Sequence, residues 1–155
     1  MAFGINDIAK VSVNIKSVDG SFNDFTLRNY GEAASSILLR PADNEPLYYR
    51  KYGTGGQALF SKSYKPKNME MEINILRLSQ DYANMQKLVQ IELAGGSAIF
   101  ECTYLDENTG ETVVSSTCVL SEIPAIETGA DINPDATYLI AMSDCDMTPP
   151  DGAVI

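Results

Sequence analysis

A change of hydrophobic period within residues 68–96 constrains the fold of this chain more than any other feature. Residues 69–75 (MEMEINI) alternate strictly, which places four apolar side chains on one face of a half-buried strand: Met69, Met71, Ile73 and Ile75. Residues 80–93 then have helical spacing, with an apolar stripe of Tyr82, Met85, Leu88, Val89 and Leu93. The sequence therefore predicts a strand followed directly by a helix that packs on a sheet.

The ends of this helix carry suitable capping residues. Ser79 is a good N-cap, and Asp81 lies in the first turn, where the helix dipole favours a negative charge. Gly95 or Gly96 is expected to end the helix, because glycine readily adopts the conformation that follows a last helical turn.

The rest of the chain indicates strands. They are expected at residues 11–18, 22–27, 37–40, 97–105, 111–120, 123–126 and 136–142, the last buried on both faces. Asp19-Gly20 and residues 106–110 indicate turns, and Pro124 interrupts its strand. We expect one mainly β, α+β domain over residues 1–155: an antiparallel sandwich or partial barrel with one amphipathic helix. Residues 149–155 are a candidate flexible tail.

Residues 41–56 (PADNEPLYYRKYGTGG) are predicted to form a projecting loop or hairpin tip. Prolines and glycines flank an aromatic and basic centre, made of Tyr48, Tyr49, Arg50, Lys51 and Tyr52. Tyrosine and arginine are enriched at protein interfaces, so this centre is a candidate contact surface. The alternatives are stacking on single-stranded nucleic acid, a phosphate cradle at the glycines, or tyrosines folded back on their own core.

Charge is distributed unevenly along the chain. Residues 1–67 carry nine Lys and Arg against six Asp and Glu, a net charge of +3. Residues 68–155 carry two Lys and Arg against fifteen Asp and Glu, a net charge of −13. The net charge of the whole chain is therefore −10. An acidic protein repels the phosphate backbone, so ordinary DNA binding is unexpected. Such a distribution allows identical subunits to dock head to tail, or simply provides a solvated surface.

Few residues suggest catalysis, a metal or a cofactor. The chain has no histidine, which removes the commonest general base and the Ser-His-Asp arrangement. Cys102, Cys118 and Cys145 are widely spaced and are predicted to be reduced, buried thiols. Asp144 and Asp146 flank Cys145, but solvated carboxylates at a strand end explain them better than a metal site. We expect no catalytic residue, cofactor, metal, secretory signal or membrane anchor.

The order of these elements resembles the tail tube proteins of contractile-tailed bacteriophages and of the related phage-like bacteriocins. Their central strand has the form G-x-x-x-V-x-V-x-L-L-x-x-S before a short helix, represented here by residues 68–79 and 80–93. A Cys-containing strand with a Pro-centred bend (118–126), a polar turn and a final apolar strand (136–142) complete the similarity. This chain lacks the glycine before the central strand and has a longer, acidic hairpin at residues 106–110.

The resemblance implies a structural protein of the virion tail, assembled in the host cytoplasm. Members form hexameric rings that stack into a tube, in which inner strands join into a continuous barrel and the helix lies outside. Here the outward helix would carry Tyr82, Met85 and Val89, and the lumen face would carry Glu70, Glu72 and Asn74. The implied partners are further copies of the chain and the tail sheath, tape measure, baseplate and terminator proteins. DNA would pass through the acidic lumen without specific binding.

Two other readings of the sequence stay open. One is another ring-forming tail protein, such as a baseplate-proximal tube protein or a type VI secretion-like tube subunit, which would share the fold. The other is a small β-barrel that binds a ligand or catalyses a reaction with a pair of carboxylates. A deep apolar pocket in the monomer would favour this last class.

Overall fold

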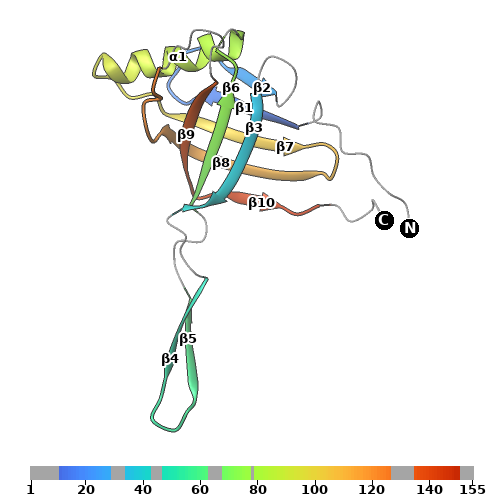
Figure 1. Ribbon diagram of the computed structural model, residues 1–155, viewed down its shortest axis with the longest axis vertical. Helices are drawn as coiled ribbons and strands as arrows, with labels where there is room; N and C mark the ends of the chain where they lie inside the picture. Colours follow the sequence, from blue (N-terminus) through green and yellow to red (C-terminus); the bar gives the residue numbers. More distant parts are fainter. Residues whose placement is uncertain are drawn as a thin grey trace.

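The computed structural model describes residues 11–28, 34–42, 47–62, 68–77, 79–126 and 135–150. In these residues the fold is mainly antiparallel β with one helix, as the sequence predicts (Figure 1). The elements are β1 (Val11–Ser17), β2 (Phe25–Arg28), β3 (Ala34–Pro41), β4 (Tyr48–Tyr52), β5 (Ala58–Lys62), β6 (Met69–Ile75), α1 (Gln80–Leu93), β7 (Phe100–Asp106), β8 (Glu111–Leu120), β9 (Ala136–Ser143) and β10 (Asp146–Thr148).

The main sheet is open and strongly bent. Its strand order is β2-β1-β7-β8-β9-β6-β3, with β10 paired to β8 beside this path. Strand β8 joins the two parts of the sheet, because its first half pairs with β7 and β10 and its last residues pair with β9. Strands β4 and β5 form a separate two-stranded sheet. The described strands therefore form no closed barrel.

Strand β6 alternates as predicted. Met69, Met71, Ile73 and Ile75 are buried, and the residues between them are half-buried. The buried set joins a core with Met85, Leu88 and Val89 of α1 and with Tyr138 and Ile140 of β9. One face of β6 therefore meets the core on which α1 packs, and its polar face points away from that core.

Helix α1 begins and ends where the sequence indicates. The Ser79 hydroxyl accepts a hydrogen bond from the Tyr82 N–H (3.2 Å) and donates one to the Leu76 carbonyl (2.7 Å). Asp81 lies in the first turn, and Gly95 follows the helix with φ +87°. The predicted apolar stripe of α1 is wrong at its last position, because the Leu93 side chain is 70% exposed. Leu93 is the last residue of α1, and Figure 1 shows one end of this helix extending past the sheet.

Other differences concern the strands. Strand β9 is not buried on both faces: Tyr138, Ile140 and Met142 are buried, but the residues between them are exposed or half-buried. Residues 123–126 are not in a strand, and Pro124 there has no N–H to donate to a ladder. Strand β3 is longer than the predicted 37–40. The predicted polar turn at 128–135 and the candidate tail at 149–155 lie outside the described residues, except for Asp135, Pro149 and Pro150.

Candidate functional site

The predicted projecting tip is a β-hairpin that continues to Lys62. Strands β4 and β5 pair from Tyr48 opposite Lys62 to Tyr52 opposite Ala58. The turn is closed by the Gly53 N–H, which donates to the Gln57 carbonyl (2.8 Å), and Gly56 has φ +82°. Figure 1 shows the hairpin extending away from the main sheet, and every residue of its two strands is exposed.

The hairpin surface is both apolar and basic. Its exposed apolar side chains include Tyr48, Tyr49, Tyr52, Leu59 and Phe60, each more than half exposed. Residues 47–62 carry Arg50, Lys51 and Lys62 and no Asp or Glu. The Arg50 guanidinium lies 5.2 Å from the centre of the Tyr52 ring, a cation–π distance. An isolated two-stranded hairpin is marginally stable in water, so this surface is suited to burial against another one.

All five residues predicted as the contact surface thus lie on one exposed strand, β4. Leu59 and Phe60 on the facing strand add to this surface and are not among the five predicted residues. The signal was present: a turn rich in glycine separates two short runs rich in apolar and aromatic residues, which is typical of a hairpin.

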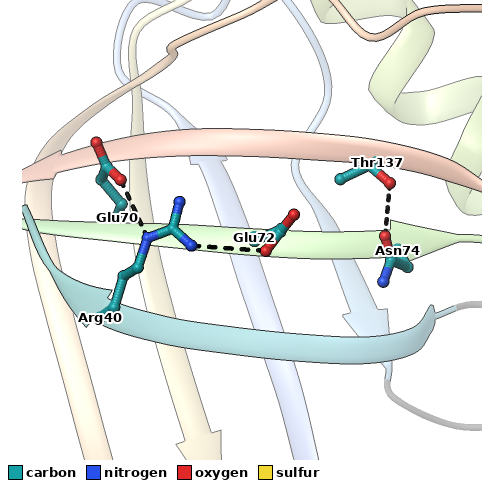
Figure 2. A network of polar contacts seen from close by, with 5 residues as sticks. All are labelled: Arg40, Glu70, Glu72, Asn74 and Thr137. Atoms are coloured by element: carbon teal, nitrogen blue, oxygen red, sulfur yellow. Dashed lines mark hydrogen bonds and ion pairs between the residues drawn. The ribbon is translucent and has the colours of Figure 1, made fainter.

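The polar face of β6 carries the predicted Glu70, Glu72 and Asn74, and the structure adds two partners from neighbouring strands. Arg40 of β3 contacts both carboxylates: its Nε lies 3.3 Å from Glu70 Oε2, and its Nη1 lies 3.7 Å from Glu72 Oε2 (Figure 2). The Thr137 hydroxyl of β9 donates to Asn74 Oδ1 at 2.6 Å. These contacts follow from the strand register, which sets Arg40 opposite Glu70 and Thr137 opposite Asn74.

This face is therefore less acidic than the strand sequence alone suggests. The single positive charge of Arg40 offsets one of the two negative charges of Glu70 and Glu72, and its contact with Glu72 is the longer of the two. Apolar side chains also lie on the face: Leu38 is 50% exposed and Val119 is 37% exposed. A hollow of about 320 Å³ on the face is lined by Glu70, Val119, Ala141 and six further residues. The face is mixed in character, with a small negative excess.

Three residues of the helix that is expected to lie outside the tube, Tyr82, Met85 and Val89, belong to its apolar stripe and face the sheet. Met85 and Val89 are buried in the core, and Tyr82 is half-buried. The Tyr82 hydroxyl accepts a hydrogen bond from Gln86 Nε2 (2.8 Å), and the Arg77 guanidinium lies 6.0 Å from the Tyr82 ring centre. Met85 and Val89 therefore hold α1 on the sheet and offer no surface to a partner.

The three cysteines are buried and free, as predicted. A hydrogen bond with Cys118 and burial raise the pKa of Cys102, and the same hydrogen bond lowers the pKa of Cys118. Burial raises the pKa of Cys145. In the part of the chain that the structure describes, no group of three or more Cys, Asp or Glu side chains is placed to hold a metal ion. No described helix has the length and apolar character needed to span a membrane.

No protein-family model and no curated protein matches this sequence. Solved structures do match the fold. A chain in the cryo-EM structure of the anti-feeding prophage baseplate, 6-fold symmetrised, aligns over 96% of this chain and 98% of its own length, with 14% identity and a TM-score of 0.56. The fold is one found in phage-like particles. A chain in the virion of the native gene transfer agent particle aligns over 88% and 95%, with 12% identity and a TM-score of 0.53.

Proposed function

We propose that this protein is a structural subunit of a phage-tail-like particle, and that its copies form hexameric rings that stack into the tail tube. The observation that carries this proposal is the extent of the fold match. It covers nearly the whole of both chains in two different multi-subunit particles, one of them described as 6-fold symmetrised.

The open sheet supports assembly into a closed ring. Strands β2 and β3 end the strand order, and each has one edge without a partner strand among the described residues. Unpaired edges are a risk for uncontrolled aggregation, and pairing around a ring removes that risk. In this arrangement the inner strands of neighbouring subunits join into one barrel, and α1 covers its outside.

The polar face of β6 is then the face of the lumen, with Glu70, Glu72 and Asn74 exposed to the channel. The total charge of −10 and the negative excess on this face repel the DNA backbone, so DNA slides through without binding. Arg40 makes the lumen less negative than its glutamates alone would make it. The proposal places the protein in the virion tail, surrounded by a contractile sheath and working with tape measure, baseplate and terminator proteins.

Light scattering over a concentration series tests this proposal. The purified protein should give a species of six times the chain mass, and larger species should appear as the concentration rises. A monomer at every concentration, in a sample shown to be folded by circular dichroism, would count against the proposal.

A second candidate function is a baseplate-proximal ring of such a particle, which is favoured by the match to a baseplate chain. The same light-scattering series separates the two candidates. A tube subunit continues to grow with concentration, whereas a baseplate ring stops at the mass of a single ring.

A further inference from the structure

The ladder between β7 and β8 is irregular in the middle of the main sheet. Phe100 of β7 pairs with Cys118 of β8. Two residues further along β7, Cys102 pairs with Ser115, so two steps on one strand correspond to three on the other. Residues 116–117, which lie in the longer step, are exposed. A β-bulge of this kind leaves one residue unpaired and disrupts the ladder locally, so β7 and β8 are held together least tightly here.

The bulge also lies where β8 changes its second neighbour. Up to Val114, β8 pairs with β10, and from Thr117 onward it pairs with β9. The fully buried Ser115 side chain stabilises this junction. Its hydroxyl donates to the Ser143 carbonyl oxygen at 2.6 Å and lies 3.2 Å from the Thr117 carbonyl oxygen. A covalent link at this point would therefore fix the bend of the sheet.

Two thiols meet on the buried side of this bulge. Cys102 and Cys118 are both fully buried and free, and a hydrogen bond joins their side chains. The hydrogen bonds of the third thiol, Cys145, are made with Ser115 and with the Met69 backbone. Two sulfur atoms that are in contact across neighbouring strands need little movement of the backbone to form a disulfide. Cys102 and Cys118 are therefore the matched pair among the three cysteines.

We propose that Cys102 and Cys118 are a redox-sensitive dithiol, which a low-molecular-weight disulfide oxidises to an intrachain disulfide that links β7 to β8 and stabilises the bent sheet. This inference is independent of the proposed function, because it concerns the core of a single subunit. Thiols stay reduced in a cytoplasm, and disulfides persist in oxidising surroundings. The link is therefore expected only after the protein has left a reducing compartment.

The reaction is a thiol–disulfide exchange in two steps. Local opening at the bulge admits the oxidant, and the Cys118 thiolate attacks one of its sulfur atoms. The S–S bond of the oxidant breaks, and the departing sulfur takes up the proton that Cys118 has lost. Cys102 then attacks Cys118 Sγ in the mixed disulfide, and its proton passes to the second small thiol as that thiol leaves. Two protein thiols are thereby oxidised, and one small disulfide is reduced to two thiols.

Cys118 is the thiol that attacks first. The hydrogen bond with Cys102 lowers the pKa of Cys118, which increases the fraction of the reactive thiolate. The same hydrogen bond and burial raise the pKa of Cys102, so Cys102 keeps its proton until the mixed disulfide has formed beside it. Cys118 also lies next to the exposed residues 116–117 of the bulge, where opening of the ladder admits the oxidant.

Incubation of the reduced, folded protein with oxidised glutathione tests the pair. A glutamyl endopeptidase places the three cysteines on separate peptides, which are residues 102–107, 112–122 and 128–155. Mass spectrometry without reduction should find the first two peptides joined, with a mass lower by two hydrogen atoms than the sum of the separate peptides. Free thiols in a sample shown to be folded by circular dichroism, a lasting glutathione adduct, or a link that includes Cys145 would overturn the inference.

Three matched variants, each with alanine in place of one buried thiol, separate the pair from the third cysteine. Cys145→Ala should form the same link, whereas Cys102→Ala and Cys118→Ala should form none. Because the disulfide closes a short loop, oxidation should raise the midpoint of thermal unfolding of the wild type by roughly 6–12 °C. An unchanged midpoint in the wild type, or an equal rise in Cys118→Ala, would contradict the proposed link and leave the proposed function untouched.

Discussion

Arg40 on β3 pairs with Glu70 on β6 across the polar face of the sheet, with Nε and Oε2 3.3 Å apart. The same guanidinium reaches Glu72, so one cation serves two carboxylates on alternate positions of the central strand. A face that the strand sequence presents as a row of acids is therefore partly neutralised. In a tube with this face inside, the lumen would be less negative than the two glutamates alone would make it.

Substituting Arg40 should affect stability only slightly. The Arg40 side chain is 41% exposed and that of Glu72 is 37% exposed, and exposed ion pairs contribute roughly 0.2–1 kcal/mol. We expect Arg40→Ala to lower the free energy of unfolding by no more than this, measured by urea denaturation of the monomer. Arg40→Lys, which keeps the charge, should lose less. A loss of about 3–5 kcal/mol would instead identify a buried, tightly coupled pair.

A core substitution on the same strand pair should be far more costly. Ile73 lies at the centre of β6 and is fully buried, so Ile73→Ala removes packed methyl groups and leaves a cavity. Such changes typically cost about 2–5 kcal/mol. Leu38 on neighbouring β3 is 50% exposed, and Leu38→Ala should change the free energy of unfolding by less than about 0.5 kcal/mol. Similar losses in the two variants would show that the assigned faces of the sheet are wrong.

Tyr138 carries a hydroxyl that is buried without a hydrogen-bond partner in the described structure. A buried, unsatisfied polar group costs about 1–3 kcal/mol, so Tyr138→Phe should leave stability unchanged or raise it at neutral pH. Tyr48→Phe on the exposed hairpin is the control and should have no effect. A clear loss of stability in Tyr138→Phe, measured by thermal unfolding, would mean that this hydroxyl has a partner.

The environment of Tyr138 also predicts that the stability of the protein decreases at alkaline pH. Burial, with a smaller contribution from Tyr82, raises the pKa of Tyr138 above its ordinary value. The folded state then keeps this proton at a pH where the unfolded state releases it. Its contribution to stability is complete below about pH 10, the ordinary tyrosine pKa, and decreases as the pH rises above that value. Tyr138→Phe should reduce this alkaline loss, measured as the slope of unfolding free energy against pH.

The hairpin is predicted to act in assembly and to contribute little to the fold. Tyr49→Ala with Arg50→Ala removes apolar area and charge from an exposed strand, so the variant should remain a folded monomer that does not polymerise. Ser61→Ala, on the strand position that faces Tyr49, is the control and should assemble normally. Circular dichroism checks the fold and light scattering checks the assembly. Assembly of the double variant like that of the wild type would exclude β4 as the contact.

The features that sequence predicts well here depend on local periodicity. The alternation in β6 and the capped, apolar stripe of α1 are set by residues close in sequence, and both are confirmed. The single error in the stripe, Leu93, arises because periodicity identifies a face of the helix but not where the sheet beneath it ends. Residues 136–142 are so rich in apolar side chains that the alternation of β9 is hidden, although one of its faces is partly open.

Contacts that depend on the order and register of the strands cannot be predicted from local periodicity. The contact of Arg40 with Glu70 needs the register of β3 on β6, and the hydrogen bond of Thr137 to Asn74 needs β9 beside β6. Residues 123–126 contain good strand formers but pair with no strand among the described residues, because the ladder between β8 and β9 ends at Leu120. The aromatic and basic composition of residues 48–52 does identify the hairpin as a candidate surface, since it needs no long-range contact.

Electron microscopy of the purified wild-type protein in negative stain, at the highest concentration used for light scattering, tests the central claim most directly. The account predicts rings with six-fold symmetry that stack into hollow tubes of constant diameter. Separate rings that never stack would support the baseplate-proximal alternative. A field of single folded subunits, with neither rings nor tubes, would contradict the account.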